Sequence, residues 1–169
     1  RQGWLMQGIP AERCESVAEH SFGVAVLAML LAEAFYPDLD RNKLLKMALI
    51  HDFGEVYAGD IVPESPLSLQ EKHKLEKKSV TQIFERLPNG AAYLAIWAEF
   101  EEKKSPEAQF IRELDKLEMA LQASVYEHQN EIELIDFFHS AEKEISTAEL
   151  VAILNNLNAL RPQQPGHSI

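Results

Sequence analysis

Signals that mark the starts of helices recur along this chain and constrain its fold more than any other feature. Capping boxes, in which a Ser N-cap is followed three residues later by Glu, occur at residues 16–19, 68–71 and 146–149. Asp40 is a further N-cap candidate, and Ser105-Pro106 combines an N-cap with a proline at the first helical position. No stretch has the apolar/polar alternation of a strand. The sequence therefore predicts an all-α fold.

The apolar pattern between these signals gives approximate helix positions. Residues 22–36 are apolar nearly all round, which predicts a buried central helix that ends before Pro37. The glycines and proline of residues 1–13 predict an irregular approach segment, and residues 163–169 a frayed tail. Further helices are expected near residues 41–50, 69–87, 91–102, 106–130, 132–139 and 147–160. Because 46% of the 169 residues are hydrophobic, we predict one compact domain over residues 1–169, a bundle of about six to eight helices.

The net charge and the cysteine content limit which partners the protein can bind and in which cellular compartment it is expected. The chain has 16 Lys and Arg against 27 Asp and Glu, a net charge of -11. This charge repels a nucleic-acid backbone and an anionic membrane, so neither is expected as a partner. Cys14 is the one cysteine and excludes an internal disulfide. Together with the lack of a signal-like or membrane-length apolar stretch, it predicts a cytoplasmic protein. The chain opens at Arg1 and not at Met, which suggests further residues upstream.

Chemistry-bearing side chains are concentrated in residues 47–60. His51 and Asp52 are adjacent and lie about 100° apart around a helix, so both reach one point only where the helix ends. Gly54 is expected to end it. Glu55 follows His51 by four residues, and Asp60 lies after a second glycine. The structural alternative is a helix end followed by solvated acids, but acids there oppose the helix dipole and call for another explanation.

Two further candidate ligands lie elsewhere in the chain. His20 falls in the first turn of the helix capped by Ser16, and Asp115 falls in the middle of the helix expected over residues 106–130. With His51 and Asp52 they form a mixed nitrogen and oxygen set that suits Mn²⁺, Co²⁺, Fe²⁺, Mg²⁺ or Zn²⁺ and leaves positions for substrate. Spacing alone does not assemble the four, because a single histidine near an apolar face is more often a core or capping residue.

Longer motifs surround these candidates and resemble a known family. The segments E-S-V-A-E-H-S (15–21), H-D-F-G-E-V-Y-A-G-D (51–60) and E-L-D-K-L-E-M (113–119) are similar to the HD-domain superfamily of metal-dependent phosphohydrolases, and most to its 5′-deoxynucleotidase branch. The resemblance implies a helical, homodimeric enzyme that hydrolyses deoxyribonucleoside 5′-monophosphates with a divalent metal. It implies as metal ligands His20, His51, Asp52 and Asp115.

The resemblance also implies roles for other residues. Glu55 and Asp60 match the family's two further acidic positions and are candidates for proton handling. Arg1 matches a phosphate-binding arginine, although Gln2 and Gly3 separate it from Trp4, whereas the matching pair is adjacent in some family members. Trp4 is expected to crowd the 2′ position of the sugar, and ordinary packing is its alternative role. Backbone groups of the loop from Asp60 to Pro63, which includes Ile61, are expected to touch substrate.

Other functions are compatible with the same candidate site residues. Fold and ligands do not fix the substrate, so a cyclic nucleotide, a nucleoside triphosphate or a guanosine alarmone is an alternative. A non-catalytic nucleotide sensor is another. Trp97 is expected either in the core or at a dimer interface, and the acidic residues Glu127, Glu131 and Glu133 on an exposed face.

Overall fold

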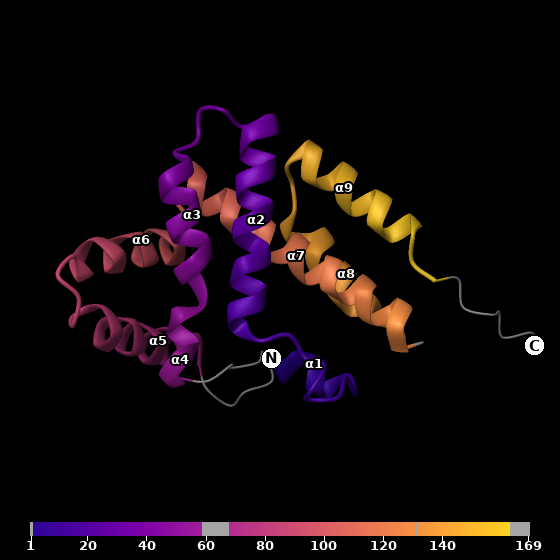
Figure 1. Ribbon diagram of the computed structural model, residues 1–169, viewed down its shortest axis with the longest axis horizontal. Coiled ribbons are helices and arrows are strands. Elements are labelled where there is room, and N and C mark those ends of the chain that lie inside the picture. Colours follow the sequence, from indigo (N-terminus) through magenta and orange to yellow (C-terminus); the bar gives the residue numbers. More distant parts are fainter. Residues whose placement is uncertain (1, 59–67, 131, 163–169) are drawn as a thin grey trace, which may run out of the picture. The chain divides into compact units, whose positions relative to one another are not determined.

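The computed structural model describes residues 2–58, 68–130 and 132–162, and its regular secondary structure in these ranges is entirely helical (Figure 1). The helices of ten or more residues are α2 (Val17–Phe35), α3 (Arg41–Ile50), α5 (Leu69–Phe84), α6 (Gly90–Glu102), α7 (Pro106–Asn130), α8 (Ile135–Glu144) and α9 (Ala148–Ala159). The shorter ones are α1 (Gln2–Met6), α4 (Glu55–Ala58) and the 3₁₀ helix η1 (His51–Gly54). The all-α prediction is confirmed.

Local capping explains where most of the helices begin. Ser16 and Ser68 form the predicted capping boxes, each accepting a hydrogen bond from the backbone N–H three residues later. The carboxylate of Asp40 accepts from the backbone N–H groups of Asn42 and Lys43 in α3. The hydroxyl of Ser105 accepts from the backbone N–H of Ala108 in α7. These four predicted helix starts are confirmed.

Three segments differ from the sequence-based expectation. Gln2–Met6 form a short helix where an irregular segment is predicted. Helix α8 spans Ile135–Glu144, several residues later than predicted. Helix α5 ends at Phe84, and the chain returns so tightly that a Cβ at Gly90 would lie 1.8 Å from the Phe84 carbonyl oxygen. Only glycine fits there, which lets α6 start directly beside the end of α5.

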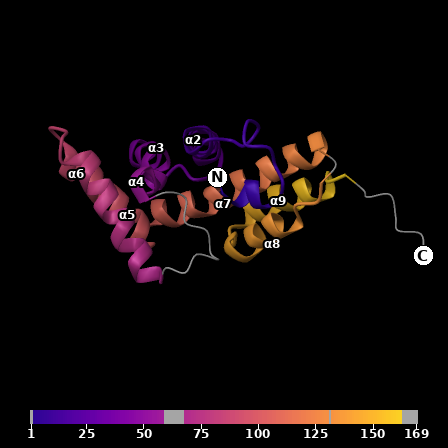
Figure 2. The same cartoon turned by 90° about the horizontal axis from the view of Figure 1, so that it is seen from below.

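The chain divides into two compact units, Arg1–Arg112 and Glu113–Ile169, and helix α7 contributes to both. The single domain predicted from the sequence stays a prediction. In the first unit α2 and α3 run side by side, and α5 and α6 form a second pair (Figure 2). A buried cluster joins the end of α3 to this second pair through Ile50, Val80, Phe84 and Trp97. The α5–α6 pair thus supports the turn that follows α3.

Helix α2 is less buried than its composition predicts. One face holds His20, Ser21, Val24, Ala25, Ala28 and Ala32, all buried. The opposite face leaves Phe22 and Leu30 more than half exposed, at 66% and 54%. Contrary to expectation, α2 is long and apolar enough to cross a membrane, as judged within the described ranges. The core helix of a soluble protein passes the same test, so the finding assigns no membrane role.

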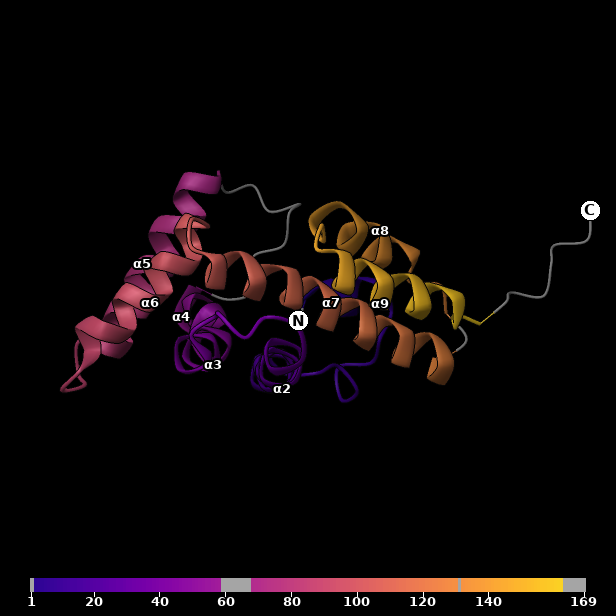
Figure 3. The same cartoon turned by 90° about the horizontal axis from the view of Figure 1, so that it is seen from above.

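In the second unit α8 and α9 lie next to each other (Figure 3). The capping box predicted at residues 146–149 is wrong. The N-cap of α9 is Thr147, whose side chain makes no capping hydrogen bond. Instead the carboxylate of Glu113 on α7 accepts from the Thr147 N–H at 3.1 Å and from the hydroxyls of Ser146 and Thr147. A distant carboxylate therefore holds the two residues that precede this helix.

The predicted exposure of Glu127 is also wrong. Glu127 is only 3% exposed. Its carboxylate accepts hydrogen bonds from the backbone N–H of Leu134 at 2.8 Å and from two nitrogens of the Arg161 guanidinium. The Arg161 guanidinium also lies over the Phe138 ring, 4.5 Å from its centroid. Burial opposes ionisation of Glu127, but these hydrogen bonds outweigh it and lower the pKa. The pair ties the end of α9 to α7 and the start of α8.

Candidate metal site at the end of helix α3

The chain delivers His51 and Asp52 through a change of helix type. Helix α3 ends at Ile50, η1 follows at once, and the backbone then re-enters an α-helix at Glu55. Gly54 therefore does not end the helical segment, contrary to prediction. Its lack of a side chain serves close packing, because a Cβ there would lie 2.7 Å from the Cβ of Glu76 on α5. The tight turn and the close approach of α5 together fix where the two candidate ligands emerge.

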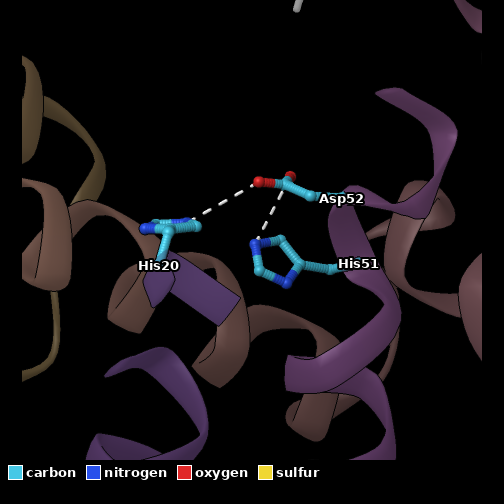
Figure 4. Close-up of side chains that lie close together, drawn as sticks. All are labelled: His20, His51 and Asp52. Atoms are coloured by element: carbon cyan, nitrogen blue, oxygen red, sulfur yellow. Dashed lines mark ion pairs between the residues drawn. The ribbon is translucent and has the colours of Figure 1, made fainter. Parts of the chain in front are cut away.

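Three of the four predicted metal ligands converge in the first unit (Figure 4). The Nε2 atom of His20 on α2 lies 3.8 Å from one carboxylate oxygen of Asp52, and the Nε2 atom of His51 lies 3.4 Å from the other. One candidate ligand atom from each residue lies within 4.8 Å of the other two. Both histidines are buried, while the Asp52 side chain is 20% exposed. The carboxylate thus stands at the solvent side of two buried imidazoles.

The orientation of the His51 ring suits a ligand. Its Nδ1 lies 2.7 Å from the carbonyl oxygen of Ala48, and because a carbonyl only accepts, Nδ1 carries a proton and donates it. In the neutral ring Nε2 then presents a lone pair toward Asp52. The Nε2 lone pair and the Asp52 carboxylate are both electron-rich, and a cation between them would stabilise their approach to 3.4 Å. A hydrogen bond from the other ring nitrogen to a backbone carbonyl, as here to Ala48, commonly orients metal-binding histidines. The donor set therefore fits a divalent metal.

The other predicted site residues have different surroundings. Glu55 is the first residue of α4 and is partly buried, with its Oε2 atom shielded from solvent. Asp115 lies on the part of α7 that belongs to the second unit, where its carboxylate pairs with Lys116 at 3.1 Å. The catalytic role of Glu55 and the ligand role of Asp115 stay predictions. Arg1, Asp60 and Ile61 lie outside the described residues.

Trp4 is surrounded by protein in this structure. It is 2% exposed, and its indole N–H donates to the carboxylate of Glu15 at 3.1 Å. This geometry favours the packing role that the sequence leaves open, although contact with substrate stays a prediction. The hydrogen bond anchors α1 to the segment just before α2.

Sequence reasoning misses two residues that contact the site. Trp97 on α6 is 1% exposed, and its indole N–H donates to the carbonyl of His51 at 3.1 Å. The Phe100 ring meets the His51 ring edge-on, with 5.3 Å between centroids. No spacing in the sequence signals these contacts, because they depend on how α6 packs against α3.

Comparison with known proteins assigns this chain to a family. The family model described as HD domain matches residues 1–157. This chain belongs to the HD domain family. A human relative, "5′-deoxynucleotidase HDDC2", is 34% identical over 165 residues, which cover 95% of this chain and 78% of the relative.

Solved structures agree with this membership. A conserved hypothetical protein from Pyrococcus furiosus is 32% identical, with a TM-score of 0.77 over 95% of this HD domain chain and 91% of the other. A protein from Magnetospirillum magnetotacticum, described as a predicted metal-dependent phosphohydrolase, is 26% identical with a TM-score of 0.63, covering 90% and 83% of the two chains. The resemblance inferred from the motifs is confirmed.

Proposed function

We propose that this HD domain is a metal-dependent 5′-deoxynucleotidase, which hydrolyses deoxyribonucleoside 5′-monophosphates to deoxynucleosides and phosphate. The observation that carries the proposal is the convergence of His20, His51 and Asp52, with the His51 ring held by Ala48 so that Nε2 faces Asp52. Relatives named 5′-deoxynucleotidase in human and in fission yeast, 34% and 35% identical, support the substrate class.

His20, His51 and Asp52 would hold the metal, and Asp115 is the proposed fourth ligand on the strength of the motif order. The nitrogen and oxygen donors accept Mn²⁺, Co²⁺, Fe²⁺, Mg²⁺ or Zn²⁺. A divalent cation held there supplies positive charge that offsets the phosphate dianion and the charge that develops during hydrolysis. The protein contributes rigidity, because both imidazoles are buried and one is oriented by a backbone carbonyl.

Proton handling is assigned to Glu55 and Asp60. Glu55 follows η1 directly, so its carboxylate is carried by the same turn as His51 and Asp52. We propose that one of the two acids takes a proton from the attacking water and that the other supports the leaving 5′ oxygen. Arg1 is proposed to bind phosphate, Trp4 to contact the sugar, and backbone groups of the loop at Asp60 and Ile61 to contact the substrate.

Two alternatives use the same site. The first alternative is an enzyme for a cyclic or polyphosphorylated nucleotide, which would hydrolyse that substrate and leave 5′-monophosphates intact. A nucleotide sensor would bind without turnover. Glu55→Ala separates sensor from enzyme, because an enzyme keeps its metal and loses rate, whereas binding by a sensor is unaffected.

The test of the substrate class measures phosphate release from dAMP, dCMP and dTMP compared with AMP, and follows the consumption of a cyclic nucleotide and of dATP by chromatography, because opening a cyclic diester releases no phosphate. The proposal expects release from the deoxy monophosphates and much slower release from AMP. Preference for the cyclic nucleotide or dATP would refute it in favour of another HD hydrolase.

We also propose that the protein is a cytoplasmic homodimer that binds neither nucleic-acid polymers nor membranes. The exposed apolar residues Phe22, Met29 and Leu30 of α2 support a face that a second copy would cover. The net charge of -11 and a single cysteine support the remaining points. Sedimentation equilibrium of the wild type and of Leu30→Glu tests the dimer. The glutamate places a negative charge in the apolar face, so we expect the variant to be monomeric.

A further inference from the structure

The backbone of the metal-site turn is held by a side chain outside the ligand set. The carbonyl of His51 lies at the junction where α3 gives way to η1, and it accepts a hydrogen bond from the Trp97 indole at 3.1 Å. A carbonyl oxygen has two lone pairs, so that of His51 can accept from Trp97 in addition to a backbone bond within η1. Trp97 donates this further hydrogen bond at the residue that also provides a proposed ligand.

Trp97 is itself fixed from several directions. The imidazole of His73 on α5 stacks on its ring, with centroids 5.9 Å apart and planes 17° apart. His73 Nδ1 in turn lies 3.1 Å from a carboxylate oxygen of Glu101. The indole also belongs to the buried cluster of Ile50, Val80 and Phe84. A ring held in this way has little freedom, so its N–H is a well-defined anchor for the carbonyl of His51.

The anchor acts at the point where both proposed ligands begin. His51 and Asp52 are consecutive, so a rotation of the peptide between them moves both side chains. The Phe100 ring against His51 and the Ala48 carbonyl at Nδ1 restrain the imidazole, whereas Trp97 restrains the peptide itself. We propose that Trp97 is a positioning residue for metal binding, acting through its indole hydrogen bond to the backbone of His51. The inference rests on the metal site proposed above.

The experiment measures Co²⁺ binding by calorimetry, and the visible spectrum of bound Co²⁺, on folded wild type and Trp97→Phe. The variant keeps an aromatic ring and loses the N–H. Outer groups that orient ligands contribute about 10- to 100-fold to metal affinity, so we expect Trp97→Phe to bind Co²⁺ at least about 10-fold more weakly with an altered spectrum. A second variant carries β-(3-benzothienyl)alanine at position 97, which keeps the shape of indole and replaces the N–H by sulfur. We expect the same loss.

Tyr93→Leu is the matched control, because Tyr93 lies one turn before Trp97 on α6 and packs against the same cluster, where its ring contacts Phe84 and not a residue of η1. It should lower the thermal midpoint while leaving Co²⁺ affinity and spectrum near those of the wild type. Equal weakening in the control, or unchanged Co²⁺ affinity in both position-97 variants, would overturn the positioning role while the wild type still binds metal. A wild type that binds no Co²⁺ would overturn the metal site itself, and the inference with it.

Discussion

Gly54→Ala tests whether close packing of α5 sets the position of the metal-site turn. The added Cβ would lie 2.7 Å from Cβ, 3.0 Å from Cγ and 3.4 Å from Cα of Glu76. Carbon atoms pack best at about 3.5–4.0 Å, so α5 and the metal-site turn have to move apart by about 1 Å. Overpacking of this kind costs about 1–3 kcal/mol, while loss of freedom in the unfolded chain returns about 0.4–1 kcal/mol. We expect a net destabilisation of about 1–2 kcal/mol.

Urea unfolding gives the free energy, and a double-mutant cycle identifies the cause. Glu76→Gly removes the obstructing Cβ and should cost about 1 kcal/mol alone, because glycine is unfavourable within a helix. In the Gly54→Ala background that cost should shrink or reverse. Glu76→Ala is the control, since it removes the carboxylate and keeps the Cβ that lies nearest to position 54.

The reasoning also predicts a functional consequence. Displacement of the turn moves Asp52, so Gly54→Ala should bind Co²⁺ more weakly than the wild type. A variant that is as stable as the wild type, or that Glu76→Ala rescues as well as Glu76→Gly does, would refute the packing argument.

Three further predictions concern charges and caps away from the site, each measured by urea unfolding. Lys43→Ala removes the cation that pairs with Glu107 at 2.8 Å and with Glu99 at 2.9 Å. Because the side chain of Glu107 is only 12% exposed, we expect a destabilisation of about 2 kcal/mol. No loss of stability would show that these ion pairs contribute nothing. Glu127→Gln should cost about 2 kcal/mol at neutral pH through its bonds to Arg161. Because the folded pKa of Glu127 lies below its ordinary value of 4.5, the difference from wild type should vanish as pH falls through that folded pKa, and a difference that persists in acid would contradict this. Ser16→Ala should cost about 1 kcal/mol through loss of the cap on α2, and an unchanged midpoint would argue against the capping box.

Local features of the sequence are sufficient for most helix starts. A capping box involves residues three apart, so Ser16 and Ser68 can be recognised without any tertiary information. The prediction fails at residues 146–149, because the N-cap of α9 is Thr147 and its partner is Glu113, more than thirty residues earlier. It also fails for Glu127, whose arginine partner is as distant. In both cases a carboxylate binds a partner that is distant in the sequence, and no local pattern reveals such a partner.

The candidate site divides in the same way. The adjacency of His51 and Asp52 at a helix end is visible in the sequence, and the structure brings His20 to them from α2. The two reasons why the turn keeps its shape were not predictable. Trp97 and the approach of Glu76 to Gly54 depend on how α5 and α6 pack, and an apolar or charged residue on those helices carries no sign of its partner.

The central claim is that His20, His51 and Asp52 hold a metal on which deoxynucleotidase activity depends. The most direct test is phosphate release from dAMP by chelator-treated protein titrated with Co²⁺, comparing the wild type with Asp52→Ala. We predict that the wild type loses activity with chelator and regains it with Co²⁺, whereas Asp52→Ala stays more than about 100-fold slower at the same Co²⁺. Full wild-type activity in chelator, or recovery of Asp52→Ala to the wild-type rate at equal Co²⁺, would contradict the claim.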